Sequence, residues 1–253
     1  MKKSSIIVSI LFVLLLCSWN IKEEINFEEI LKKADFYRGG QVIGISWNLN
    51  IENIKKGKVK NKLSLFVEAS TFEDKQFALI TFLKPKKYVG QKMLLRENSM
   101  WFINKNIRRP IPISGRQRLT GSAANADVVS ANYYRDYSIK SSSEGNYNGI
   151  PCWILDLEAK NNLTSYSRIR YWISKDRNLG LKAAFYGKSK KLIKTGIFEY
   201  ENDITYKSKN YKYISRITIF DNVNTNDKTV LEISLPTFQN FKNSKFQKNS
   251  LLD

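Results

Sequence analysis

The residues that most often carry enzyme chemistry are scarce in this chain. It contains no histidine, which excludes Ser-His-Asp and Cys-His nucleophilic sites as well as histidine metal sites. The two cysteines, Cys17 and Cys152, do not form a pair at zinc-ligand spacing, and no glycine-rich phosphate loop occurs. The acidic residues are scattered, without an evident acid/base couple. We therefore expect a protein that is not an enzyme and that holds no metal and no cofactor.

The sequence around Cys17 indicates whether the protein is exported from the cytoplasm. Cys17 ends an apolar run, Ile6 to Leu16, that follows the basic start Met1-Lys2-Lys3. This layout is typical of a secretory signal, and the run is shorter than the roughly 20 apolar residues of a membrane-spanning helix. We predict that residues 1–17 are a signal peptide and that the protein is exported. An uncleaved signal anchor and a buried core helix are the less favoured alternatives.

Cys17 stands where a lipoprotein signal carries its acylated cysteine. Leu16, however, replaces the small residue that usually precedes it, so acylation of Cys17 and plain cleavage near Ser18 are both left open. The first outcome anchors the protein in the bacterial envelope, and the second gives a soluble periplasmic protein. In either case Cys152 has no disulfide partner, and we interpret it as a small buried strand residue.

The chain is strongly basic. Its 42 lysines and arginines exceed its 23 acidic residues, for a net charge of +19. Such a field attracts lipid head groups, nucleic acid or an acidic protein. Because the lysines are spread over nearly every segment, we favour a solvated lysine-rich surface over a dedicated polyanion site. We expect a monomer that does not bind nucleic acid.

The first element after the signal is predicted to be a helix. Phe27, Ile30, Leu31 and Ala34 recur at the spacing of one helix face within residues 23–38, and Gly39-Gly40 follow. This pattern predicts an amphipathic helix that buries one face.

From Gln41 the apolar period changes to two, which indicates strands with one apolar face. The alternating apolar positions are Leu63, Leu65, Val67 and Ala69; Phe77, Leu79, Thr81 and Leu83; Trp153, Leu155 and Leu157; Ile169, Tyr171 and Ile173; and Leu231, Ile233 and Leu235. Turn residues separate these runs at short intervals. We predict roughly ten or eleven strands in an antiparallel meander that curls into a barrel or sandwich. We expect residues 23–238 to form a single mainly β (α+β) domain and residues 239–253 to be a loose tail.

One stretch interrupts the strands. Residues 120–137 follow a proline-containing segment and carry Ser122 or Asn125 as the cap of a short helix through Val128 and Val129. Long ordered insertions in a strand-rich domain often serve as functional covers. A cover over a curved sheet needs an apolar underside, which these two valines provide.

The middle of the chain resembles the outer-membrane lipoprotein-sorting family, the LolA-like periplasmic carriers. The most specific block is Gly121-Ser122 followed by Asp127-Val128, after an Arg-Pro-Ile segment. The resemblance runs over about residues 27 to 220 and is carried by Leu83-Lys84-Pro85-Lys86, Gly90, Met93-Leu94, Trp101, Arg108-Arg109-Pro110-Ile111, Leu119-Thr120-Gly121-Ser122, Asp127-Val128, Asp136-Tyr137, Gly149, Cys152, Leu155, Leu157, Tyr171-Trp172-Ile173, Tyr186, Lys194, Phe198 and Tyr200. Two departures, Ala123-Ala124 in place of an aromatic and Gly180 in place of a proline, concern the shape of the cover.

The resemblance implies a half-open antiparallel β-barrel with helices over an apolar concave face. It further implies that the cavity binds acyl chains of lipoproteins or another lipid, for transport across the periplasm, with an inner-membrane transporter as a partner. The cavity-lining candidates are Leu65, Val67, Leu79, Met93, Leu95, Trp153 and Leu155, and the cover comprises Gly121, Ser122, Asp127, Val128 and Val129. For any single one of these side chains, we favour a place in a packed core over a place at the cavity.

Two other classes of function stay open. The same fold could serve as a lipid-binding accessory subunit of an exporter in the envelope, or as a basic surface adhesin. A barrel filled by its core would argue against a carrier, and a basic groove with solvent-facing aromatics would favour a polyanion binder.

Overall fold

A computed structural model describes residues 24–40, 44–104, 106, 109–129, 132–162 and 164–252. The predicted signal peptide, with Cys17, lies outside these residues. In the described part of the chain, no helix is long and apolar enough to cross a membrane.

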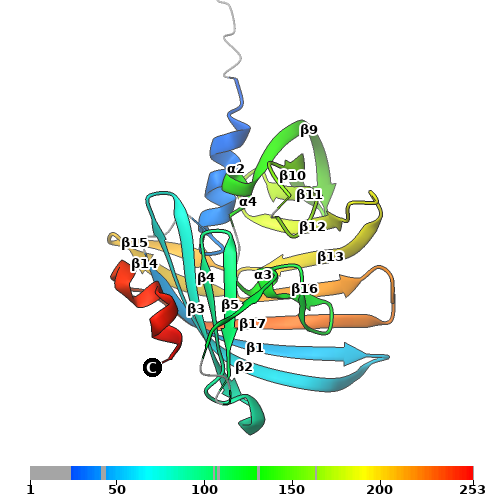
Figure 1. Cartoon of the computed structure of the whole chain (residues 1–253). Helices are drawn as coiled ribbons and strands as arrows, with labels where there is room; N and C mark the ends of the chain where they lie inside the picture. The colour runs from blue at the N-terminus through cyan, green and yellow to red at the C-terminus, as the bar shows by residue number, and fades with distance from the viewer. Residues whose placement is uncertain are drawn as a thin grey trace, which may run out of the picture.

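The molecule is built on one large antiparallel sheet (Figure 1). Thirteen strands follow one another in the order β6-β5-β4-β3-β2-β1-β17-β16-β13-β12-β11-β10-β9. Their bounds are β1 Ile45–Lys55, β2 Lys58–Phe72, β3 Lys75–Lys84, β4 Lys92–Arg96, β5 Ser99–Ile103, β6 Ile111–Ile113, β9 Tyr137–Tyr147, β10 Ile150–Ala159, β11 Arg168–Ser174, β12 Gly180–Tyr186, β13 Leu192–Glu199, β16 Arg216–Asp221 and β17 Asp227–Phe238. The two end strands, β6 and β9, do not pair with each other. The sheet therefore curls without closing, as the half-open barrel prediction required.

The main sheet has thirteen strands, more than the ten or eleven expected. The two end strands are atypical. The face of β9 is polar and exposed, and β6 is a three-residue strand with a central proline. Neither has the alternating apolar pattern that reveals a strand in sequence, because edge strands bury little side-chain surface. Four further strands form two small pairs: β7 Arg118–Thr120 with β8 Ala123–Ala124, and β14 Asn202–Tyr206 with β15 Lys209–Tyr213.

The inner face of the curled sheet packs against three helices: α2 Phe27–Phe36, α3 Asn125–Val129 and α4 Tyr133–Asp136 (Figure 1). The predicted N-terminal helix is confirmed as α2, in which Leu31 and Ala34 are buried. The Asn26 side chain accepts the Glu29 N–H at 3.0 Å and so caps its first turn. The helix ends at Phe36, and Gly39 lies in the turn that follows, at a φ of 88°, a conformation that glycine adopts without steric cost.

The outer face of β3–β5 is covered by the C-terminal segment, which the sequence predicted to be a loose tail. It forms two 3-10 turns, η2 Asn243–Phe246 and η3 Lys248–Leu251. Phe246 is fully buried against Phe77, Leu79 and Leu94, and the Arg96 guanidinium donates to the Gln247 side chain at 2.5 Å. The prediction was wrong because strands β3–β5 carry apolar side chains on both faces, and the phenylalanine in the tail covers the outer one.

The alternation predicted through Leu235 also ends early. The pairing of β1 with β17 shifts between Ser46 and Asn48, which leaves one extra residue in β17 between Ser234 and Thr237. Leu235 lies in this stretch with a φ of 52° and is 74 % exposed. A bulge of this kind interrupts the alternation of side chains between the two faces of the sheet. The series of inward-facing apolar residues therefore stops at Ile233.

Candidate functional site

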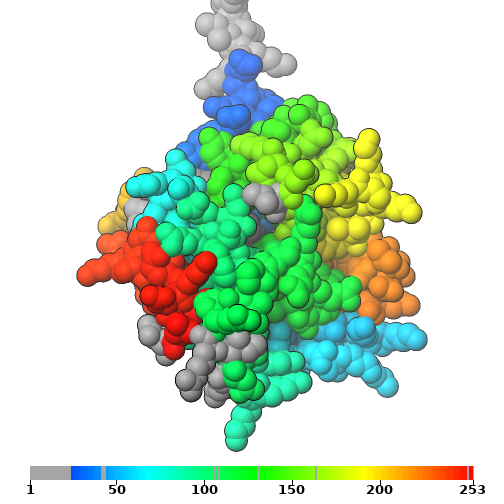
Figure 2. All heavy atoms as spheres, in the orientation of Figure 1, coloured from blue at the N-terminus to red at the C-terminus, as the bar shows by residue number. Residues whose placement is uncertain are grey.

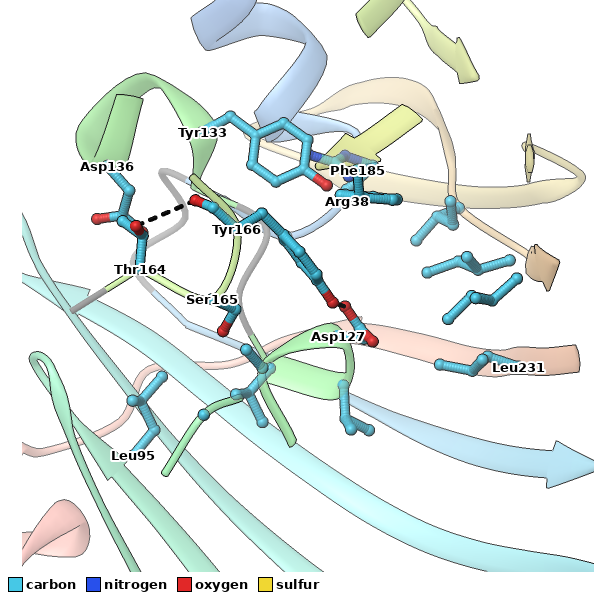
Figure 3. Close-up of a pocket in the computed structure, with 18 of the residues that line it drawn as sticks. Arg38, Leu95, Asp127, Tyr133, Asp136, Thr164, Ser165, Tyr166, Phe185 and Leu231 are labelled. Carbon is cyan, nitrogen blue, oxygen red and sulfur yellow. Dashed lines mark hydrogen bonds between the residues drawn. The ribbon is translucent and has the colours of Figure 1, made fainter. Parts of the chain in front are cut away.

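A cavity of about 130 Å³ lies between the inner face of the sheet and the helices (Figure 3). Its base is apolar and comes from seven strands of the main sheet, with the side chains Trp47, Leu49, Leu95, Met100, Phe185, Phe198, Ile217, Ile219, Leu231 and Ile233. Leu49 is paired with Ile233 across β1 and β17, and Leu231 with Ile217 across β17 and β16. Residues opposite one another in adjacent strands point to the same face. The alternation of each strand therefore merges into one continuous apolar floor.

Helix α3 roofs the cavity, and the β7–β8 hairpin leads into this helix; we name residues 118–129 the cover segment. Val128 and Val129 are buried at the cavity, and Ala126 lines it beside them. The turn between β7 and β8 lies directly on the sheet: a side-chain carbon at Gly121 would come within 2.3 Å of the Thr229 hydroxyl oxygen. Only glycine fits this close approach.

Asp127 is the polar anchor of the cover segment. Its carboxylate accepts the Ala124 N–H at 2.7 Å and the Tyr166 hydroxyl at 2.7 Å, and it forms a close ion pair with the ammonium of Lys194 in β13. Lys194 is only 5 % exposed and lies 4.6 Å from the centre of the Tyr166 ring. Burial and the neighbouring Asp127 charge raise the pKa of Tyr166 well above its usual value, so this hydroxyl stays protonated and donates. Figure 3 shows Tyr166 pointing at Asp127.

Ser122 makes a second attachment of the cover segment. Its backbone N–H donates to the Thr229 hydroxyl at 2.8 Å, and its own hydroxyl donates to Asp221 at 3.1 Å. The cover segment is thus joined to β13, β16 and β17 through polar side chains, and not by a continuous strand ladder.

One wall of the cavity is charged. The Arg38 guanidinium, just beyond α2, donates to Asp35 at 3.0 Å and lies 4.2 Å from the centre of the Tyr133 ring. The second Asp35 oxygen accepts the Tyr134 N–H at 2.8 Å, which ties α2 to α4. Complete burial raises the pKa of Asp35 to about 7, against the opposing effects of Arg38 and the Tyr134 N–H.

Sequence reasoning did not single out Asp35 or Arg38. A signal was present, because each lies one helical turn after a residue of the apolar helix face, Leu31 and Ala34 respectively. A charged residue on that face is buried when the helix docks and must then find a polar partner.

The structure divides the predicted site residues into three groups. Leu95, Asp127, Val128 and Val129 line the cavity. The second group comprises Leu65, Val67, Met93 and Leu155. These side chains are buried in the main hydrophobic core and do not line the cavity. The third group lies elsewhere: Leu79 is on the outer face under Phe246, Trp153 is half-buried against Phe27 of α2, and Gly121 and Ser122 form the turn between β7 and β8.

Most of the apolar floor was not predicted individually. Leu231 and Ile233 stood out in the sequence as inward-facing strand residues, whereas Trp47, Leu49, Phe185 and Ile219 did not enter the candidate set. Strand alternation identifies a buried face, but it does not tell which buried positions border a space. No three histidine, cysteine or acidic side chains gather as a metal site within the described ranges. The arrangement is suited to enclosing an apolar ligand.

The fold is that of the LolA superfamily. A crystal structure of a LolA superfamily protein from Nitrosomonas europaea superposes with a TM-score of 0.78 at 24 % identity, covering 89 % of this chain and 99 % of that one. An outer membrane lipoprotein-sorting protein domain from Vibrio parahaemolyticus gives a TM-score of 0.75 at 20 % identity, over 89 % and 98 % of the two chains. A DUF1329 family protein from Desulfovibrio piger gives 0.73 at 20 % identity, over 88 % and 97 %.

Within this fold class, the chain belongs to a family whose model carries the description "Uncharacterized protein" and matches residues 74–253. None of the curated proteins matches the chain. The matched residues include the cover segment, β9 to β17 and the C-terminal 3-10 turns.

Proposed function

We propose that this protein is a non-enzymatic carrier whose cavity binds the acyl chains of a lipoprotein or another lipid. The observation that supports this most directly is the continuous apolar floor beneath a short, polar-anchored cover segment. The likeness to a lipoprotein-sorting domain adds support at the level of the fold.

The energetics agree with such a role. Exposing an acyl chain to water costs about 0.8 kcal/mol per methylene, or on the order of 10 kcal/mol for one long chain. A carrier must offset most of this cost with apolar surface and still release its load. A concave apolar floor does so without any chemical step.

The size of the cavity implies that the cover segment moves. At about 130 Å³ it is smaller than the roughly 300–1,000 Å³ of typical ligand pockets. Because the cover segment is attached through side-chain contacts of Ser122 and Asp127, it can exchange these contacts for water when it lifts. We propose that an incoming chain displaces Val128 and Val129 from the floor.

The cellular setting is part of the proposal. The basic start and apolar run at residues 1–17 support export. The carrier then works in the periplasm, either free or anchored through an acylated Cys17, and exchanges its load with an inner-membrane transporter. Intact-mass measurement of the mature protein distinguishes the two forms.

A fluorescent fatty-acyl probe tests the proposal. The wild-type protein is expected to bind the probe, and mass spectrometry of gently purified protein is expected to find co-purified lipid. Ala126→Phe, which projects a ring into the cavity from the half-buried face of α3, is expected to weaken probe binding at least tenfold. Ile25→Phe adds the same ring at an exposed position and should leave binding unchanged.

A lipid-free mass spectrum together with no binding of the probe would contradict the proposal. Unchanged binding in Ala126→Phe would also count against it, because the probe would then be attaching outside the cavity.

A further inference from the structure

Three hairpin tips lie side by side along one edge of the sheet. The β1–β2 tip adjoins the β16–β17 tip, because Lys55 pairs with Asp227 and the Lys56 N–H donates to Asn226 at 3.1 Å. The β16–β17 tip adjoins the start of β13, because the Asn222 N–H donates to Ile193 at 3.0 Å. We name these tips the hairpin edge, residues 55–62, 187–192 and 221–226. It forms the right-hand side of the molecule in Figures 1 and 2.

The hairpin edge carries uncompensated positive charge. Among its described residues, six exposed lysines form no ion pair: Lys56, Lys58, Lys60, Lys188, Lys190 and Lys191. The acidic groups beside them are already engaged. Asp221 accepts the N–H groups of Val223 and Asn224, each at 2.8 Å, and Asp227 pairs with Lys55 at 3.7 Å.

The same edge exposes aliphatic side chains. Val223 at the β16–β17 tip is 72 % exposed, Val59 is 44 % exposed and Leu192 is 37 % exposed. Aliphatic groups set among lysines match the interface of an anionic bilayer, where the charges meet phosphates and the aliphatic groups enter the acyl boundary. A nucleic acid would gain nothing from the valines, because stacking on bases requires aromatic rings.

The hairpin edge also adjoins the cover segment. A surface groove is lined by Ser122, Ala123 and Ala124 of the cover segment together with Val223 and Asn224 of the hairpin edge and Ile193 directly after it. Asp221, which accepts the Ser122 hydroxyl, belongs to the β16–β17 tip. Whatever the hairpin edge touches is therefore close to the attachment of the cover segment.

We propose that the hairpin edge docks on a membrane surface rich in anionic phospholipid, which brings the cover segment next to the bilayer. This inference extends the proposed function by naming the surface at which loading or release takes place. Its test uses intact vesicles and mutations outside the cavity, so its failure is distinguishable from failure of acyl binding.

Co-sedimentation with phosphatidylglycerol-containing vesicles tests the charge. The wild-type protein is expected to bind them more tightly than phosphatidylcholine vesicles, and less tightly as salt rises. Lys58→Glu/Lys190→Glu/Lys191→Glu is expected to weaken this binding at least tenfold. The control Lys207→Glu/Lys209→Glu/Lys242→Glu changes the net charge equally, at exposed positions in the β14–β15 hairpin and the C-terminal segment. These elements lie on the left-hand side of Figure 1, and the control should stay within about twofold of wild type. Both variants should keep wild-type binding of the soluble acyl probe.

A second variant tests the choice of a membrane. Val223→Ser is expected to weaken vesicle binding severalfold and to leave binding of a DNA oligonucleotide unchanged. The proposal is overturned if the two triple variants lose vesicle binding equally, if the wild type does not prefer anionic vesicles, or if oligonucleotide binding depends on the hairpin-edge lysines while vesicle binding does not.

Discussion

At the scale of single residues, the cover segment depends on one nearly buried ion pair. Asp127 and Lys194 have side chains only 10 % and 7 % exposed, so neither charge is well solvated on its own. The pair satisfies its remaining hydrogen-bonding capacity through Ala124, Tyr166 and Ser122. Buried pairs of this kind cost little when replaced together but much when broken.

We expect Asp127→Asn to lower the free energy of unfolding by about 3 kcal/mol, because it leaves the Lys194 ammonium buried without a counter-charge. The double variant Asp127→Asn/Lys194→Met should recover most of this loss, because no buried charge is then left. Urea denaturation of the four proteins in this cycle measures the coupling. Additive losses in the double variant would show that the two side chains do not act as a pair.

Asp35 should make stability depend on pH. Its pKa is about 7 in the folded protein, against about 3.9 in an unfolded chain, so the folded state holds the proton more tightly. The stability associated with protonated Asp35 is fully present below about pH 4 and is lost as the pH rises to about 7.

The comparison with Asp35→Asn isolates this effect, since asparagine does not titrate. The wild type's advantage in unfolding free energy over Asp35→Asn should shrink by about 1.4 kcal/mol per pH unit between about pH 4 and 7. Denaturant unfolding at several pH values measures it. An advantage that stays constant, or grows with pH, would refute the assignment.

At the scale of elements, the C-terminal 3-10 turns act as part of the fold. They cover the outer face of β3–β5, and the Lys245 ammonium pairs with Glu68 at 2.9 Å to hold them. Phe246 contributes a fully buried ring, which gives the segment a hydrophobic anchor.

Phe246→Ala is expected to lower the free energy of unfolding by about 3–5 kcal/mol, the usual cost of removing a buried aromatic ring. Leu252→Ala, at a neighbouring position that is 52 % exposed, should change it by less than about 0.5 kcal/mol. Guanidinium denaturation of both variants gives the comparison. Similar small effects from both would mean that the segment does not pack on the sheet in solution.

At the scale of the whole molecule, the open sheet, the helices and the cover segment jointly create the cavity. An acyl ligand that binds only the folded protein must stabilise it by mass action. At a free concentration of about 100 times its Kd, the gain is about 2.7 kcal/mol, which corresponds to an increase in Tm of about 5–10 °C for a domain of this size.

Thermal unfolding with a soluble fatty-acyl ligand therefore gives an independent readout of the cavity. The wild-type Tm should rise as ligand is added, and that of Ala126→Phe should not. An equal rise in both proteins would place the ligand outside the cavity.

Much of this architecture was determined by the sequence alone. The spacing of Phe27, Ile30, Leu31 and Ala34 predicted α2, because a helix that buries one face must repeat its apolar residues every three or four positions. Alternation at Leu63, Leu65 and Val67 likewise predicted strands, and Val128 with Val129 marked the cover segment. These are local patterns, in which backbone geometry dictates which side chains share a face.

Only the tertiary structure decided which of those faces border a space. Leu65 and Leu95 were both predicted to line the cavity, but Leu95 lines it and Leu65 is packed within the core. Leu79 faces the opposite side, where Phe246 covers it. The ion pair of Asp127 with Lys194, and the alignment of three hairpin tips into one basic edge, join residues far apart in sequence. Such contacts follow from the register and curl of the whole sheet, which no local pattern specifies.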